Sequence, residues 1–225
     1  MNELLLRRRV AKMESGPTEK SYIQDGLIFQ LDGINKGSNV NAWTDLVGGI
    51  PFVYNEAATI KQNSVSLDGT NYLRPSNDRT ISTSYLTSTI EVCANQGSNY
   101  GGVFISGANN SICFIRKSNG LTTGVSTNNS RKRLTASGAI PNTVYTASVN
   151  VNTFYIVNGI SKSLSTASEW VKSQTRYVSI GGNENGYMGA MEIYAVRVYN
   201  RILTIDEVLY NQKIDNERFN LELVI

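Results

Sequence analysis

Short runs of β-type residues recur along most of this chain, and they predict an all-β protein. After residue 20 such runs return every 8 to 15 residues or so, with turn-forming residues between them. Regular short strands separated by turn signals are typical of a β-sandwich. The predicted strands are residues 26–31, 50–54, 64–68, 85–94, 102–106, 111–116, 132–136, 143–150, 153–160, 176–181 and 187–199.

The last of these strands leads directly into a predicted helix. Residues 189–199 carry apolar groups at both odd and even positions, which favours a strand buried between two sheets. The Thr204 hydroxyl can bond the amide three residues on, and Glu207 can reach back, which makes a capping box. A short C-terminal helix is therefore predicted to begin just after Thr204.

Residues 1–20 differ from everything that follows and form a predicted helical N-terminal arm. Four apolar residues fall at helical spacing with three arginines between them, and residues 15–17 (SGP) end the turn. We expect this arm to dock or anchor the protein on a neighbouring subunit whose carboxylates pair with the arginines. A frayed chain end and a helix folded back on its own domain are the alternatives. The residues of the docking arm are Leu5, Leu6, Arg7, Arg8, Arg9, Val10 and Met13.

The other end of the chain also departs from the main pattern. Residues 218–225 alternate apolar and polar groups at first and predict an extra strand beyond the helix. The expected organisation is therefore an arm over residues 1–20, one domain over residues 21–217 and a C-terminal extension over residues 218–225.

Composition supports one large β-domain and excludes some partners. The 225 residues include 4 prolines, 19 glycines and 12 tyrosines, which suits many short strands joined by tight turns. The 21 Lys and Arg nearly balance the 18 Asp and Glu, so neither nucleic acid nor an anionic membrane is an expected partner. No apolar run approaches the roughly 20 residues that span a bilayer, and a soluble protein is expected.

The two cysteines, Cys93 and Cys113, pair only if their strands are adjacent, and the interpretation that we favour is two reduced, partly buried thiols. A secretory signal begins with basic residues followed by an apolar stretch. Here residues 4–6 (LLL) precede residues 7–9 (RRR), so the chain is expected to fold inside the cell that makes it.

Four segments of the chain, in order, resemble the laminin-G-like, concanavalin-A-like jelly-roll family. Residues 189–208 are similar to the closing strand and helix of that family. Residues 25–33 with 43–49 are similar to its opening strand and the W-x-D-x-x-G turn that follows. The resemblance implies a concanavalin-A-like antiparallel β-sandwich and a core or near-core position for Trp43. The segments are residues 25–33 (DGLIFQLDG) with 43–49 (WTDLVGG), 154–160 (FYIVNGI), 177–183 (YVSIGGN) and 189–208 (GAMEIYAVRVYNRILTIDEV).

Catalytic chemistry finds little support in this sequence, and no cofactor is expected. The chain contains no histidine, which excludes Ser-His-Asp and Cys-His arrangements and histidine-based zinc sites. Glycosidases with this jelly roll carry paired carboxylates on one strand, as Glu-x-Asp-x-x-Glu or Glu-x-Asp-x-Glu. Here Glu91 and Glu192 each stand alone, so the protein is not expected to be an enzyme.

A metal site is not expected either. Calcium in laminin-G-like domains is held at the sandwich rim by an Asp and nearby carbonyls. The candidate ligands here read better as turn formers, and the Asp68-Gly69 and Asn158-Gly159 pairs are hairpin signals. These candidates are Asp45, Asp68, Asp78 and Asn183.

Recognition by loops remains, and sugar binding needs an aromatic face with amide or carboxylate groups beside it. Tyr100 and Trp170 lie in polar stretches where such a platform can form, although packing beneath a loop is the plainer interpretation of each. Residues 127–133 place Arg131, Lys132 and Arg133 after two amides, which suits an acidic glycan or partner, with a solvated hairpin tip as the alternative.

The start of the chain, residues 4–9 (LLLRRR) and 22–34 (YIQDGLIFQLDGI), resembles laminin-G-like proteins of phages and prophages of gut bacteria. This resemblance implies a non-catalytic virion structural protein, a fibre or decoration, held on the particle by its arm and displaying loops toward a surface glycan. A homo-oligomer or a place in a larger assembly is expected. A carbohydrate-binding or adhesion module on a bacterial cell surface and a glycoside hydrolase are the alternatives.

Overall fold

A computed structural model describes most of the strands and the C-terminal helix of this protein. For the strands between residues 103 and 136 and between residues 155 and 162, and for residues 96, 149–150 and 177–178, the description covers the backbone alone. The described residues are 21–76, 88–96, 103–107, 110–117, 120–127, 130–136, 144–150, 155–157, 160–162, 177–182 and 188–223.

The strands form two antiparallel sheets. Sheet A has the order β14-β13-β12-β7-β16-β5-β4, and β1 pairs with β16 beside that path. Its strands are β1 (Leu27–Asp32), β4 (Thr59–Ile60), β5 (Val65–Asp68), β7 (Thr89–Gln96), β12 (Val144–Asn150), β13 (Tyr155–Val157), β14 (Ile160–Lys162) and β16 (Ala190–Tyr199).

Sheet B has the order β11-β10-β9-β8-β15-β6-β3-β2. The two sheets and the single described helix, α2 (Ile205–Phe219), confirm the predicted all-β sandwich with one C-terminal helix. The strands of sheet B are β2 (Ala42–Thr44), β3 (Pro51–Tyr54), β6 (Leu73–Pro75), β8 (Val103–Gly107), β9 (Asn110–Lys117), β10 (Gly120–Thr127), β11 (Ser130–Ala136) and β15 (Tyr177–Ile180).

Every predicted strand has a counterpart, but the structure also contains strands that the pattern did not predict. The longest of these is β10, whose two glycines and four Ser or Thr residues give no hydrophobic alternation. It forms because β9 and β11 flank it and bond its backbone on both sides. Residues 153–160, predicted as a run with a hairpin signal at Asn158-Gly159, contribute to the hairpin β13–β14, which confirms that signal.

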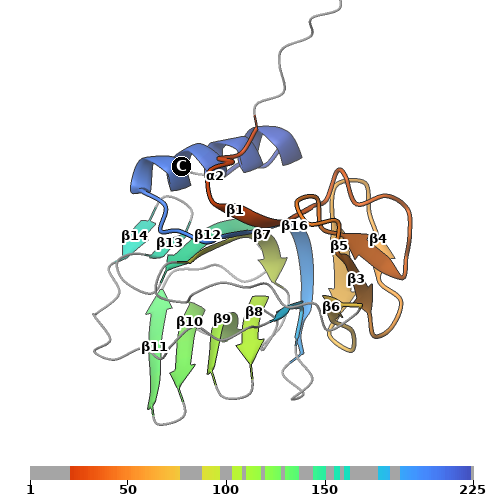
Figure 1. Cartoon of the computed structure of the whole chain (residues 1–225), viewed down its shortest axis with the longest axis horizontal. Helices are drawn as coiled ribbons and strands as arrows, with labels where there is room; N and C mark the ends of the chain where they lie inside the picture. Colours follow the sequence, from red (N-terminus) through yellow and green to blue (C-terminus); the bar gives the residue numbers. More distant parts are fainter. Residues whose placement is uncertain are drawn as a thin grey trace, which may run out of the picture.

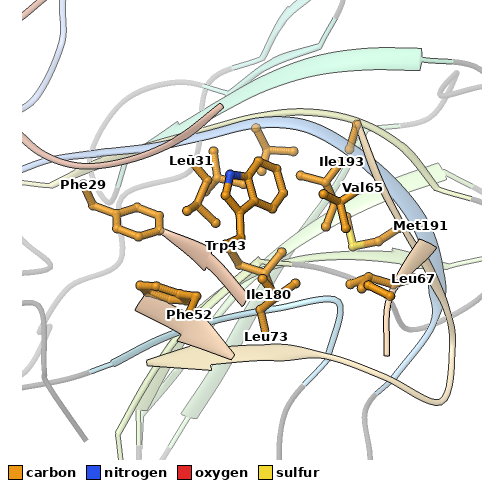
Figure 2. Packing of buried hydrophobic residues seen from close by; sticks show 14 of the residues in the cluster. Phe29, Leu31, Trp43, Phe52, Val65, Leu67, Leu73, Ile180, Met191 and Ile193 are labelled. Atoms are coloured by element: carbon orange, nitrogen blue, oxygen red, sulfur yellow. The ribbon is translucent and has the colours of Figure 1, made fainter. Parts of the chain in front are cut away.

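An apolar core fills the space between the sheets. Trp43 is fully buried in it, and Figure 2 shows its indole ring surrounded by side chains from both sheets. The rings of Phe29 and Phe52 approach to 4.9 Å between centroids. Each large side chain buried in this way stabilises the fold by about 1.5–3 kcal/mol. The core position implied for Trp43 is confirmed.

The interpretation of β16 as a strand between two sheets is corrected by its register. Met191 and Ile193 belong to the core, and so do Val196 and Val198, although their positions have the other parity. The change follows from a β-bulge between Ile193 and Ala195 in the pairing with β7. One face of β16 therefore stays in the core throughout, while residues 195, 197 and 199 lie on the opposite face.

That opposite face of sheet A is covered by α2. Figure 1 shows the helix lying across sheet A on the side away from sheet B. The predicted capping box is confirmed, since the Thr204 hydroxyl accepts from the Glu207 amide and Glu207 Oε2 accepts from the Thr204 amide at 2.8 Å. The helix thus starts where the sequence predicts.

The end of the helix differs from the prediction. The helix runs through the expected boundary at residue 217 to Phe219, and Asn220 ends it in a left-handed conformation with φ of 52°. The amides of Leu221 and Leu223 then bond the backbone and side-chain oxygens of Asn216. Because residues 221–223 bond the last helical turn, they form no strand, and the extra strand predicted over residues 218–225 is wrong for its described part.

Asp68-Gly69 was predicted as a hairpin signal, and the structure corrects this. The pair follows β5 in sheet A, and the next strand, β6, belongs to sheet B. The turn at Gly69, where φ is 98°, therefore carries the chain between sheets. The Asn158-Gly159 turn lies outside the described residues, between two strands that do pair as a hairpin.

Candidate functional site

Several predicted site residues fall outside the described part of the chain. Tyr100 and Trp170 are among them, as are Asp78 and Asn183 and the whole N-terminal arm with Leu5, Leu6, Arg7, Arg8, Arg9, Val10 and Met13. Their roles remain predictions.

The basic residues Arg131, Lys132 and Arg133 are described by their backbone, and they lie in β11, the edge strand of sheet B. The alternative of a solvated hairpin tip does not hold for these three residues, because β11 begins at Ser130, which already pairs with Thr127 of β10. The three cations therefore occupy ladder positions, and one side of their strand has no partner strand among the described residues. Basic residues are common on such edges, where they discourage further strand pairing.

The register places Arg131 in a row that crosses five strands of sheet B. Arg131 pairs with Ser126 of β10, which pairs with Ser111 of β9. Ser111 pairs with Ser106 of β8, and Ser106 pairs with Tyr177 of β15. We call this set of residues the Tyr177–Arg131 row. An aromatic residue, three hydroxyl residues and an arginine thus share one line.

This row has the residue types that bind sugars. Serine hydroxyls both donate and accept hydrogen bonds, and a guanidinium donates to hydroxyl or carboxylate oxygens. An aromatic ring can stack on the apolar face of a sugar ring. Sequence reasoning found Arg131 but missed Tyr177 and the serines, because β10 was not predicted and the register across the sheet could not be followed.

Of the two carboxylates weighed for glycosidase chemistry, Glu192 forms an ion pair near the start of β16. Its Oε2 lies 2.9 Å from Lys61 Nζ, and its Oε1 accepts from the Ser64 hydroxyl at 2.6 Å. Partial burial disfavours the charged form, but the hydrogen bonds from Lys61 and Ser64 outweigh it and lower the pKa of Glu192. Glu192 is therefore unsuited to act as a general acid.

The other carboxylate, Glu91, lies beneath α2 and not in the space between the sheets. Its Oε2 accepts from Arg197 Nε at 2.9 Å and from Asn211 Nδ2 at 2.8 Å. Burial raises the pKa of Glu91 to about 7, against the opposing effect of Arg197. Glu91 is 2% exposed and covered by the helix, so the arrangement holds α2 on the sheet and offers no access to a substrate.

Arg197 is the centre of this polar cluster. It pairs with Glu91 on β7 and with Asp215 on α2, and its guanidinium carbon lies 4.0 Å from the centre of the Tyr22 ring. The Tyr22 hydroxyl donates to Asp215 at 2.9 Å. The segment at residues 22–24 is therefore tied to the same face of sheet A as the helix.

Two candidate calcium ligands are described, and both organise turns. Asp45 is buried, and its carboxylate accepts the backbone amides of Gln30, Val47 and Gly48 at 2.7–3.1 Å. Asp68 accepts the amide and hydroxyl of Thr70. These bonds confirm the interpretation of both residues as turn formers. No group of three or more His, Cys, Asp or Glu residues that could hold a metal ion occurs in the described ranges.

Cys93 is a free, fully buried thiol on the α2 side of sheet A, where it contacts Ala195 and Phe219. Cys113 lies in β9 of the other sheet. The strands of the two cysteines are therefore not adjacent, and adjacency is the condition that the sequence set for a disulfide between them. In the described part of the chain, the helix α2 is not long and apolar enough to cross a membrane.

Comparisons with known proteins identify the fold and leave the family open. No protein-family model matches the sequence, and no match emerged from the comparison with curated proteins. The likeness to the laminin-G-like family, and to its phage members, therefore remains a resemblance.

Solved structures do match. Domain 4 of AbnA, a GH43 extracellular arabinanase from Geobacillus stearothermophilus, in complex with arabinotriose, has a TM-score of 0.60 at 15% identity, covering 81% of this chain and 96% of that one. The binding domain of botulinum neurotoxin serotype D has a TM-score of 0.62 at 14% identity, covering 84% and 51%. A sialidase of Trypanosoma rangeli has a TM-score of 0.59 at 11% identity and covers 88% of this chain.

This chain spans about a third of that sialidase, 34% of its length. At such low sequence identities, the likeness concerns the β-sandwich fold. The same fold carries many different functions in different proteins.

Proposed function

We propose that this protein is a non-catalytic glycan-binding module that contacts its sugar through the Tyr177–Arg131 row of sheet B. The observation that carries the proposal is the register, which aligns an aromatic residue, three serines and an arginine across adjacent strands. Neighbouring strands lie about 4.8 Å apart. Five strands therefore span the length of several sugar units.

The position of the row within the sandwich supports this proposal. Successive residues of a strand alternate between the two faces of a sheet. Ile180 belongs to the core between the sheets, and Tyr177, three residues earlier in β15, takes the opposite face. The row thus belongs to the outer face of sheet B, while α2 covers the outer face of sheet A (Figure 1).

The names of two structural neighbours are consistent with this proposal. The arabinanase domain, which this fold matches over 96% of its length, was solved with arabinotriose, and a binding domain of botulinum neurotoxin DC was solved in complex with SialylT. By analogy with these two proteins, we propose that the β-sandwich of this chain also binds a glycan without catalysing a reaction on it. The lack of histidine and the engaged states of Glu91 and Glu192 favour binding over hydrolysis.

We also propose that the module is carried on a virion, as a fibre or decoration protein, with a bacterial cell surface as the alternative location. The resemblance of its first residues to phage-encoded proteins supports this. Residues 22–24 lie against α2, so an arm that precedes them starts on the side of sheet A. The proposed anchoring side and the proposed recognition face of sheet B would then point in opposite directions.

A glycan array tests the binding proposal. Immobilised glycans, including arabinan oligosaccharides and sialylated glycans, would be probed with the wild-type protein and with Arg131→Ala. A matched control is Lys213→Ala, which removes an exposed basic residue from α2, on the outer face of the other sheet. We expect at least a tenfold loss of binding for Arg131→Ala and none for the control. Silence across the array, or equal effects of both variants, would reject the proposal.

Deletion of residues 1–20 tests the anchoring proposal separately. The shortened protein keeps Tyr22, so we expect a folded, β-rich domain that still binds glycan but no longer enters particles. Unchanged incorporation into particles would contradict the arm's role and leave the glycan proposal standing.

A further inference from the structure

The interface between α2 and sheet A contains buried polar atoms that have no hydrogen-bond partner among the described residues. Glu91 Oε1 and Ser148 Oγ are two of them, and so are both polar side-chain atoms of Gln212, Nε2 and Oε1. The three residues are 2%, 1% and 2% exposed. A buried polar group without a hydrogen bond costs about 1–3 kcal/mol, so folded proteins rarely leave several of them in one place.

These atoms come from elements that meet at one place. Ser148 of β12 and Glu91 of β7 are direct partners in the ladder, and Arg197 of β16 continues the same row. On α2, Gln212 comes directly after Asn211 and about one turn before Asp215. Asn211 bonds Glu91, and Asp215 bonds Arg197. Gln212 is buried and lies on α2 between two residues that bond Glu91 and Arg197 of this row.

The neighbouring groups are already committed. All three guanidinium nitrogens of Arg197 bond the carboxylates of Glu91 and Asp215. The Asn211 amide nitrogen bonds Glu91 and the Tyr199 hydroxyl, and its oxygen accepts from the Ile23 amide. These groups are therefore poorly placed to satisfy the unpaired atoms as well.

We propose that one or two buried water molecules occupy the interface beneath α2 and bridge Glu91, Ser148 and Gln212. A buried water normally makes about three hydrogen bonds, between two and four, and it needs a polar site. The atoms at hand suit it: the Gln212 amide donates, its carbonyl and Glu91 Oε1 accept, and the Ser148 hydroxyl does either. The water then links the helix to β7 and β12, beside the direct ion pairs through β16.

The first test is a crystal structure of the full chain at a resolution that shows ordered water. We expect density for a water within about 3.2 Å of Glu91 Oε1 and of at least one atom of Ser148 or Gln212. A direct hydrogen bond from Ser148 or Gln212 to Glu91 Oε1, or an interface without water density, would overturn the proposal.

A second test works in solution and does not depend on crystals. NMR would record cross-relaxation between water and the side-chain amide protons of Gln212. We expect this signal in the wild-type protein and in Ser66→Ala, a control on β5 of the same sheet, and a weakened signal in Ser148→Ala. If the folded wild-type protein shows no cross-relaxation between water and the Gln212 amide protons, the proposal is wrong.

Discussion

Arg197 on β16 and Asp215 on α2 form a bidentate ion pair, with both N–O distances at 2.7 Å and side chains that are 1% and 0% exposed. This pair lies on the outer face of sheet A, beneath the helix. Since Glu91 shares the same arginine, the helix is held on the sheet by charge as well as by apolar contacts of Val208 and Phe219. The consequence is an interface that is sensitive to the loss of any one charge.

Replacing Asp215 with Ala should therefore destabilise the protein strongly. Removing one partner leaves the Arg197 charge buried with a single carboxylate, and such changes cost about 3–5 kcal/mol. Urea unfolding would measure the free energy of unfolding. Asp206→Ala, which removes an exposed aspartate from the first turn of the same helix, should change it by less than about 1 kcal/mol. Equal effects of the two variants would contradict the role of the buried pair.

Stability should depend on pH through Glu91. Its pKa is near 4.5 in the unfolded chain and is raised to about 7 in the folded protein, so the folded state binds the proton more tightly. The free energy of unfolding should therefore fall as pH rises from about 4.5 to about 7, by roughly 1–3 kcal/mol. The groups that face Glu91 are Arg197, Asp215, Asn211 and Tyr199.

The check is a series of urea unfolding curves between pH 4 and pH 8. Glu91→Gln should flatten this part of the profile, whereas Glu222→Gln, an exposed change near the end of the chain, should leave it in place. If Glu91→Gln leaves the slope of the profile between about pH 4.5 and pH 7 unchanged, the pKa of Glu91 is not raised in the folded protein.

Gly181→Ala should be severely destabilising. Gly181 has φ of 85°, a conformation that residues with a Cβ rarely adopt, and a Cβ there would lie 2.1 Å from Leu67 Cδ1 in the core. Gly37→Ala makes a comparison, because that glycine also has positive φ but nothing within 4 Å of an added Cβ. Thermal unfolding should show a clearly larger drop in Tm at position 181. If the two variants melt together, the clash with Leu67 does not matter.

Thr204→Ala should weaken the start of α2 by about 1 kcal/mol, because it removes the side-chain acceptor for the Glu207 amide. Thr204→Ser keeps the hydroxyl and should stay close to wild type. Both variants would be compared by urea unfolding, followed through the circular dichroism of the tyrosines and tryptophans. A serine variant as unstable as the alanine variant would mean that the hydroxyl is not the relevant group.

Local patterns determined a large part of this protein. The alternation of apolar residues located most strands, and the Thr204 and Glu207 pair located the start of the helix, because both features depend on residues close together in sequence. The turn after Trp43 was also readable, since the Asp45 carboxylate bonds the amides of Val47 and Gly48, two and three residues further on. Each of these is a short-range relationship.

Tertiary structure alone decided how distant strands meet. The Tyr177–Arg131 row exists only because five strands align in one register, and its weakest member in sequence, β10, is held by its neighbours. The bulge in β16 and the burial of Glu91, Arg197 and Asp215 beneath α2 likewise depend on which faces come together. Sequence spacing sets which residues share a strand, but the free energy of long-range packing sets which strands are neighbours.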